Sequence, residues 1–333
     1  MSILNRACTL DEVVAVLEAQ RDLYLLPEDR VLFVLDEAYY DLPIPHLFTT
    51  WPYDVVRIPL VERPGMEYEV DEALLADKTL AWLITSLSVS HASTSRRIRK
   101  ELGIFTISNP GITPDWPAIL KAEYREQCQS TAERILEAMG GDVGGMMHVS
   151  SPDGIDLNLL LPARNWKIEA GTREGSMTNG VFGELCNVPY WADGVLILEA
   201  GDFLTNPINR LTDRVELVVE DNVVVEIKGG EEAERLRKLL EAAQDPRAFR
   251  LGEFSFGLNP GLPDRLYCST VAEKLLGGVH VAMGTPLSVN PRSPHFSRFT
   301  EVGYSAGVHI DAIKLRVSAR FLGDLLKDGA LAV

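Results

Sequence analysis

Two of the six histidines lie in short apolar segments that glycine introduces. His280 is part of "GVHVAMG", and His309 is part of "GVHIDAI", where Asp311 follows two residues later. In a β-strand, residues i and i+2 point to the same face, so His309 and Asp311 present an imidazole and a carboxylate side by side. Both groups are ligands for zinc, cobalt, manganese or iron. The pattern therefore predicts a metal site.

Carboxylates in apolar surroundings provide further candidate ligands. Glu184 lies in "GVFGELC" and Glu253 in "RLGEFSFG". Such acids are rarely buried unless they are paired or bind a metal, although each alone is equally consistent with an exposed edge strand. With two histidines and Asp311, they form a set for two metal ions about 3.5–4 Å apart. The same set suits one iron with two histidines and one carboxylate.

Glu273 precedes His280 by seven residues. It is a candidate for a further ligand or for the base that deprotonates a metal-bound water. The alternative is an exposed helical glutamate beside Lys274. His91 follows the predicted strand 79–88, at a strand-to-helix junction of the kind that often binds ligands, and is a candidate substrate-binding residue.

The order of elements predicts an α/β N-terminal domain followed by a mainly β (α+β) metal-binding domain. Up to residue 116, predicted helices alternate with apolar runs in a β/α layered pattern. Residues 117–144 read as a connecting helix and a glycine linker, and residues 145–333 as the mainly β catalytic domain. Within the latter, Asp221 and Asn222 mark a hairpin turn. The predicted strands and helices in the first part are 9–20, 30–36, 55–61, 79–88 and 103–108.

Composition narrows the range of partners. The formal net charge is −16, which argues against general affinity for nucleic acid and for anionic membranes. No run reaches the roughly 18–20 apolar residues of a membrane span. The four cysteines form no CxxC pair, and the start of the chain lacks the apolar core of a signal peptide. We therefore expect reduced thiols and a cytoplasmic protein.

Several segments resemble the aminopeptidase T/S family of metallopeptidases. They are "ITSLSVSHASTSRR", "SNPGITPDW", "SSPDGIDLNLLL", "TNGVFGE", "LGEFSFGLNPG", "AEKLLGGVHVAMG" and "GVHIDAI", and together they cover about residues 80–315. The resemblance implies a cytoplasmic homodimer with two divalent ions (zinc, cobalt or manganese) that acts on a small molecule or short peptide. It places the metal ligands on Glu184, Glu253, His280, His309 and Asp311, and the base on Glu273.

The chain departs from this family in several respects, one of which is the run Asn187, Val188 and Pro189 in place of a more typical Ile-Ala-Pro-like run. It is shorter than typical members, and Leu287 stands where some members carry a tyrosine, for which Tyr304 is a candidate substitute. The sequence also resembles the 2,5-dihydroxypyridine 5,6-dioxygenases, which hold one iron(II) with a similar His-x-Asp pair. Those enzymes have a histidine at the position of Glu253 and no counterpart of His280. The sequence thus favours an amide-cleaving hydrolase, with an iron(II) ring-cleaving dioxygenase as the alternative and a non-enzymatic binding protein third.

Overall fold

The computed structural model describes most of the chain, in eight segments. Two predicted substrate-binding residues, His91 and Tyr304, lie outside the described residues. The chain forms two compact units, of which the first contains the described parts of 1–125, 171–182 and 261–267, and the second the described parts of 126–170, 183–260 and 268–333. The described segments are residues 8–62, 65–90, 92–140, 144–162, 166–173, 176–205, 209–284 and 309–333.

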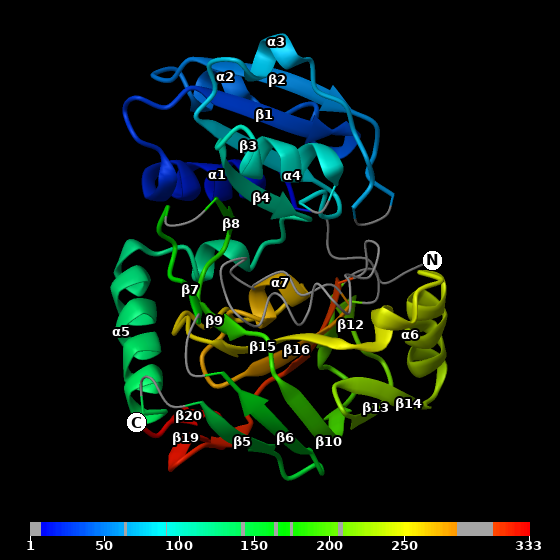
Figure 1. The fold of residues 1–333 in the computed structure, drawn as a ribbon. Coiled ribbons are helices and arrows are strands. Elements are labelled where there is room, and N and C mark those ends of the chain that lie inside the picture. The colour runs from blue at the N-terminus through cyan, green and yellow to red at the C-terminus, as the bar shows by residue number, and fades with distance from the viewer. Residues whose placement is uncertain are drawn as a thin grey trace. The chain divides into compact units, whose positions relative to one another are not determined.

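The first unit contains a five-stranded parallel sheet with the strand order β2-β1-β3-β4-β8 (Figure 1). Its central strands β1 and β3 are buried at every position, as expected of continuous apolar runs in a parallel sheet. The edge strand β8 comes from a later part of the sequence than the other four. The strands are β1 (Val31–Asp36), β2 (Tyr53–Ile58), β3 (Leu80–Thr85), β4 (Phe105–Pro110) and β8 (Met177–Asn179).

Helix α1 (Leu10–Tyr24) shows how the sequence defines the helices of this unit. Thr9 caps its N-terminus, and Thr9 and Glu12 form a reciprocal capping box. Val13, Val16 and Leu17 recur at helical spacing and are buried. The other helical elements before residue 120 are η1 (Glu37–Tyr39), α2 (Ile44–Leu47), α3 (Glu72–Leu75), α4 (Ser93–Lys100) and η2 (Trp116–Ala118).

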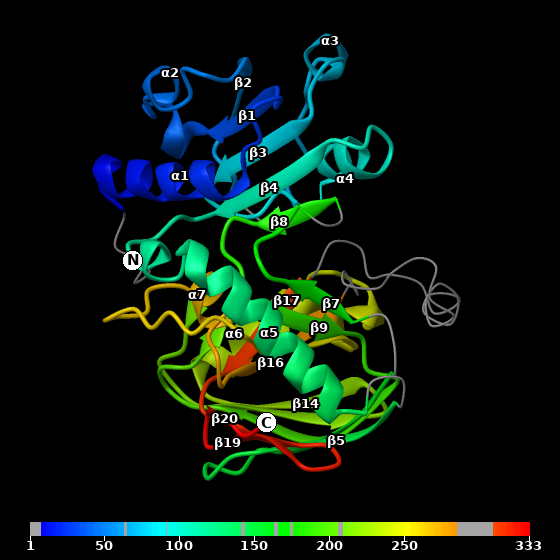
Figure 2. The ribbon, with the colours of Figure 1, turned by 90° about the vertical axis from the view of Figure 1, so that its left-hand side faces the viewer.

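The predicted connecting helix appears as α5 (Ala122–Ala138), which runs along the flank of the second unit in both views (Figures 1 and 2). It begins at Ala122, later than the predicted segment 117–144 does, because Pro117 lies in the short 3₁₀ turn η2. Its buried residues are Cys128, Thr131, Ala132 and Ile135.

The second unit contains two antiparallel sheets, the first with the order β14-β13-β10-β6-β5-β18-β19-β20. The predicted turn joins β13 and β14, and Asp221 and Asn222 both have positive φ angles (46° and 66°), as a type I′ hairpin requires. Helix α6 (Glu231–Glu241) follows this hairpin. The strands are β5 (Gly145–Ser150), β6 (Asp156–Leu161), β10 (Trp191–Leu198), β13 (Val215–Glu220), β14 (Val223–Gly229), β18 (Ser318–Arg320), β19 (Asp324–Lys327) and β20 (Ala330–Leu331).

The other sheet of this unit has the order β12-β11-β17-β16-β15-β9-β7. Strands β9, β15 and β16 are buried at every position, so polar side chains on them need internal partners. Two short helical elements, η3 (Pro246–Phe249) and α7 (Ser269–Ala272), flank β15 in the sequence. The strands are β7 (Lys167–Glu169), β9 (Glu184–Asn187), β11 (Phe203–Leu204), β12 (Asn209–Arg210), β15 (Leu251–Gly257), β16 (Val279–Gly284) and β17 (His309–Lys314).

The protein is therefore a mixed α/β chain with several sheets and few helices. Among the described residues, no helix combines the length and the apolar character needed to cross a membrane.

Candidate metal centre

The predicted ligands converge on one face of the seven-stranded sheet. Glu253 on β15, Ala282 on β16 and Asp311 on β17 are direct neighbours across three strands. Ser255 and His280 form the next cross-strand pair on the same face. Glu184 lies opposite Gly257, and His309 lies opposite Gly284, again on this face. The structure thus brings together all five residues predicted as ligands.

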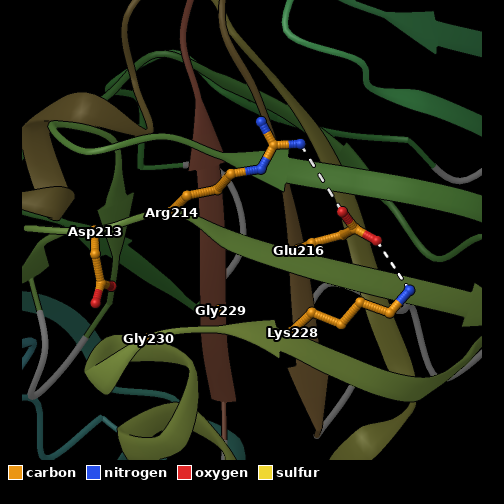
Figure 3. A pocket seen from close by; sticks show the side chains of 6 residues that line it. All are labelled: Asp213, Arg214, Glu216, Lys228, Gly229 and Gly230. Carbon is orange, nitrogen blue, oxygen red and sulfur yellow. Dashed lines mark hydrogen bonds and ion pairs between the residues drawn. The ribbon is translucent and has the colours of Figure 1, made fainter.

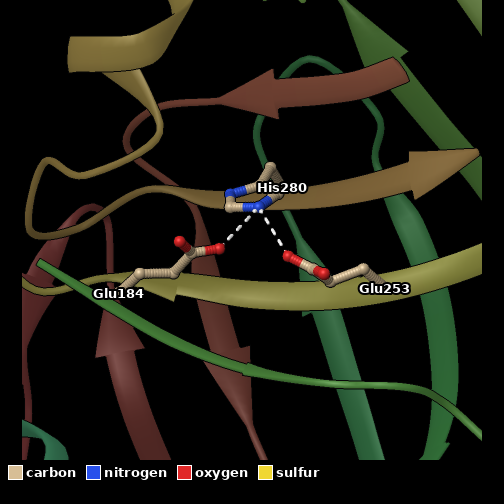
Figure 4. A group of neighbouring side chains, drawn as sticks. All are labelled: Glu184, Glu253 and His280. Atoms are coloured by element: carbon tan, nitrogen blue, oxygen red, sulfur yellow. Dashed lines mark ion pairs between the residues drawn. The ribbon is translucent and has the colours of Figure 1, made fainter. Parts of the chain in front are cut away.

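Glu184, Glu253 and His280 form the tightest part of this group (Figure 4). Each offers one ligand atom, and the three atoms lie within 4.8 Å of one another. His280 Nε2 is 3.1 Å from Glu184 Oε1 and 3.4 Å from Glu253 Oε1. The three side chains are buried, so neither glutamate is the exposed edge-strand acid of the alternative interpretation. Two buried carboxylates around one nitrogen are a suitable donor set for a divalent cation.

Ser255 lies between the same two carboxylates. Its hydroxyl is 2.9 Å from Glu184 Oε1 and 3.1 Å from Glu253 Oε1. A hydroxyl has one proton, so it can donate to only one of the two acids at a time. The charges of the two acids are therefore balanced by nearby cations, and a metal ion that binds His280 Nε2 would add to that balance.

Asp311 connects this group to His309. Asp311 Oδ1 lies 3.0 Å from His309 Nε2 and 3.9 Å from His280 Nε2. Thr205 holds the carboxylate, because its hydroxyl donates to Asp311 Oδ2 at 2.9 Å and accepts from the Asp311 backbone N–H at 2.6 Å. Asp311 Oδ1 is buried and accepts no hydrogen bond of good geometry from a described residue. Thr205 thus fixes the carboxylate through Oδ2 and the backbone. Its other oxygen, Oδ1, lies beside two imidazoles, where it is suited to bind a metal ion.

The charges at the centre shift the pKa values strongly. Burial alone would lower the pKa of His280, but its contacts with Glu184 and Glu253 raise this pKa well above the usual value. Burial alone would raise the pKa of Glu184, but the charges of Lys274 and His280 hold it well below its usual range. For Asp311, the charge of His309 outweighs burial and lowers the pKa. A metal that binds at His280 Nε2 must displace this proton.

Glu273 and Lys274 directly follow α7, and both are buried (8% and 0% exposed). The alternative of an exposed helical glutamate beside a lysine is therefore wrong. Burial is the main reason why the pKa of Glu273 is raised to about 7; Lys274 opposes this shift, and the charges of Asp311 and Glu184 add to it. A carboxyl group that titrates near neutrality is suited to acid–base catalysis.

Sequence reasoning missed three residues of the centre: Ser255, Thr205 and Lys274. Ser255 follows Glu253 by two residues, so the strand alternation that placed other ligands was a usable signal. Thr205 and Lys274 had no such signal, because their partners Asp311 and Glu184 are about a hundred residues away in the chain.

A hollow elsewhere in the second unit has a different character (Figure 3). It has a volume of about 370 Å³ and lies where the β13–β14 hairpin meets the start of α6. Glu216 there is 3.1 Å from Lys228 and 3.9 Å from Arg214, so the charges pair with one another. None of the predicted site residues lines it. Its lining residues are Asp213, Arg214, Glu216, Lys228, Gly229 and Gly230.

Comparison with known sequences points to one family. Residues 116–263 match the family described as 2,5-dihydroxypyridine 5,6-dioxygenase (NicX), a segment that includes Glu184 and Glu253. The 2,5-dihydroxypyridine 5,6-dioxygenase of Pseudomonas putida is 33% identical over 81 residues. That alignment spans 22% of this chain and 23% of the relative, so it covers less than a quarter of either protein.

Comparison with solved structures covers the whole chain. The 2,5-dihydroxypyridine dioxygenase from Pseudomonas putida KT2440 has a TM-score of 0.72 at 18% identity, over 98% of both chains. Wild-type AmpT from Thermus thermophilus, an aminopeptidase T, has a TM-score of 0.66 at 17% identity, over 97% of this chain and 100% of its own. These similarities show a common fold.

The two kinds of comparison support the two predicted resemblances unequally. The fold is shared with both the dioxygenase and the aminopeptidase, whereas the sequence similarity is to the dioxygenase. The prediction of aminopeptidase family membership therefore has support from the fold alone. Because the matched relatives are enzymes, the comparisons support enzyme status for this chain.

Proposed function

We propose that this protein is an iron(II)-dependent dioxygenase that cleaves the ring of a hydroxylated pyridine or a similar aromatic compound. The observation that carries the proposal is the centre of a buried His280, a partly buried His309 and several buried carboxylates on one face of a sheet. Sequence similarity to 2,5-dihydroxypyridine 5,6-dioxygenase runs through the segment that contributes Glu184 and Glu253. The proposal reverses the preference that the sequence motifs alone suggested.

His280, His309 and Asp311 would hold the iron, with Glu253 as a further candidate ligand. Two histidines and one carboxylate are the ligand set of non-haem iron(II) oxygenases, which leaves positions open for other molecules. A bound ferrous ion supplies the one-electron chemistry that lets dioxygen react with an electron-rich ring. Thr205 fixes Asp311 through two hydrogen bonds and so orients one ligand.

Glu273 would accept the proton of the substrate hydroxyl. The hydroxyl of a hydroxylated ring must lose its proton to make the ring electron-rich, and a carboxylate with a pKa of about 7 accepts a proton near neutral pH. Since Glu273 is buried, the carboxylate would exchange this proton out of contact with bulk water.

A metal-dependent hydrolase is the second candidate. It is favoured by the buried pair of Glu253 and His280, two residues that the aminopeptidase resemblance assigns as ligands. In this case two zinc, cobalt or manganese ions would activate a water that attacks an amide bond of a short peptide or small molecule. Glu273 would then accept the proton of that water. A homodimer and a cytoplasmic location stay predictions for either function.

The two functions can be separated with one preparation of the protein. Metal-free protein is loaded under anaerobic conditions with Fe²⁺, and oxygen consumption is measured with 2,5-dihydroxypyridine and with catechols. A parallel sample is loaded with Zn²⁺, Co²⁺ or Mn²⁺ and assayed with aminoacyl amides. Oxygen uptake coupled to loss of the aromatic absorbance supports the proposal. Amide cleavage without oxygen uptake would overturn it in favour of the hydrolase.

A further inference from the structure

Lys274 lies among three buried carboxylates. Its Nζ forms an ion pair with Glu184 Oε2, is 3.1 Å from Glu273 Oε1 and is 3.4 Å from Glu169 Oε2. Its side chain is 0% exposed, and those of the three acids are 5–9% exposed. Three carboxylates converging on one point are the kind of site that binds a divalent cation. Here an ammonium group is at that point.

The backbone holds Lys274 in place. Its carbonyl accepts hydrogen bonds from the backbone N–H groups of Leu258 (3.0 Å) and Asn259 (2.7 Å), just after β15. At Gly257, the end of β15, a Cβ atom would come within 2.0 Å of the Leu275 carbonyl oxygen. The segment after α7 is therefore packed directly onto the end of the strand, and the lysine side chain starts from a fixed position.

Glu184 is shared between this cation and the candidate metal ligands. Its Oε1 is 3.1 Å from His280 Nε2, and its Oε2 pairs with Lys274. A carboxylate whose second oxygen is bound to an ammonium group can give only one oxygen to a metal ion. It cannot bridge two metal ions with one oxygen on each, as a carboxylate of a two-metal site commonly does.

We propose that Lys274 is a built-in cation that takes the place of a second divalent ion and limits the centre to one metal ion. This inference rests on the single-metal centre of the proposed function. It states that one residue, Lys274, sets the number of metal ions at the centre. Lys274 is a positioning residue here, because it acts on the metal through Glu184. It would also hold Glu273 in place beside the centre through their contact at 3.1 Å.

The test is the number of metal ions per chain in Lys274→Met. Metal-free wild-type protein and variant are equilibrated with MnCl2, passed through a desalting column and analysed by mass spectrometry of the metal content. We expect about one Mn²⁺ per chain in the wild type and about two in the variant, because three buried carboxylates then lose the ammonium group on which they converge. The thermal midpoint of the variant should also rise more steeply with MnCl2 concentration than that of the wild type.

Two further variants make the result specific. Lys274→Met combined with Glu169→Gln removes one of the three acids without changing a candidate ligand of the main centre, and it should return to one Mn²⁺ per chain. Lys274→Arg keeps a positive charge and should also bind one. A lysine with a purely structural role would give a less stable Lys274→Met variant with an unchanged metal count.

Three results would overturn the inference. They are two ions per chain in the wild type, one ion per chain in a folded Lys274→Met variant, and failure of this variant to fold at any MnCl2 concentration. The metal count is measured without a substrate, so its result does not depend on whether the protein is a dioxygenase. One ion per chain without oxygen uptake would refute the dioxygenase and leave the role of Lys274 intact.

Discussion

Two buried acids, one in each unit, show different ways to keep a carboxylate away from water. Asp36, at the end of β1, accepts hydrogen bonds from the backbone N–H groups of Ala38 (3.2 Å), Val61 (3.2 Å) and Ser86 (2.7 Å). These donors are fixed parts of the main chain, in segments that follow the carboxyl ends of β1, β2 and β3. The hydrogen bonds of this carboxylate therefore stabilise the fold.

Glu253, on β15, instead contacts side-chain groups whose protons can move. Its carboxylate contacts the hydroxyl of Ser255 at 3.1 Å and His280 Nε2 at 3.4 Å. The serine hydroxyl can rotate toward Glu184, and the imidazole can lose its proton to make room for a metal ion. The comparison teaches that the partners of a buried acid, more than its burial, separate a structural carboxylate from a metal ligand.

The largest expected effect comes from Glu253→Gln. The amide keeps the shape of the side chain but removes the charge, so the affinity for Fe²⁺ or Mn²⁺ should fall on the order of 100-fold or more, with loss of turnover. Metal content after desalting and titration with MnCl2 measure this. Glu226→Gln, an exposed acid on β14, is the matched control and should keep the metal. Full metal content in Glu253→Gln would remove Glu253 from the ligands.

Glu273→Gln tests an acid whose role depends on its proton. The variant should bind the metal with nearly unchanged stoichiometry while kcat falls by about 10²–10⁴, since it can no longer accept a proton. Steady-state kinetics and metal analysis together measure this split. Glu241→Gln, an exposed acid at the end of α6, serves as the control. Equal kcat values for the Glu273→Gln variant and the wild type would exclude the proton transfer.

Asp36→Asn should have the opposite profile. It replaces one accepting oxygen of the buried carboxylate with a donor NH2 group that faces a main-chain N–H, which costs about 2 kcal/mol of the free energy of unfolding. The metal content should stay at the wild-type value. Chemical denaturation measures the free energy of unfolding. Asp41→Asn, at a nearby exposed aspartate, is the control. A clear loss of metal in Asp36→Asn would contradict the division into structural and metal-binding acids.

The smallest effect concerns pH. Because the pKa of His280 is raised in the metal-free protein, the imidazolium persists above the usual pKa of about 6.5. The stability that it contributes is present below that value and is lost as the pH rises through the raised pKa. Metal binding displaces this proton, so the affinity should rise about tenfold per pH unit in the same window. Titrations with MnCl2 between pH 6 and 8 measure the slope, and a flat profile would contradict a protonated His280.

Local patterns allowed the sequence to predict much of the fold. The helix predicted within 9–20 and the turn at Asp221 and Asn222 depend on neighbouring residues, and both are present. The edge strand β8 was not predicted, because a three-residue strand has no periodicity to read and its partner β4 lies about 70 residues earlier.

The candidate centre was predictable in residue types but not in contacts. The i, i+2 spacing of His309 and Asp311 follows from strand geometry and needs no knowledge of the fold. The strand order β9-β15-β16-β17, which brings Glu184 and Glu253 to His280, is set by long-range pairing and could not be read from the sequence. Lys274 was missed for the same reason. The roles of these residues as ligands stay predictions until a metal is measured.

Gly257 gives the position of Lys274 an unexpected dependence. It carries no charge, yet the absence of its side chain lets the Leu275 carbonyl lie against the end of β15. Any larger residue there would have to push the main chain away, together with the lysine next to Leu275. A homologue with a larger residue at this position would lose the ion pairs between Lys274 and the three acids, which would then be able to bind a second ion. If Lys274 sets the number of metal ions as proposed, selection on that number would also act on Gly257, which takes no part in the chemistry.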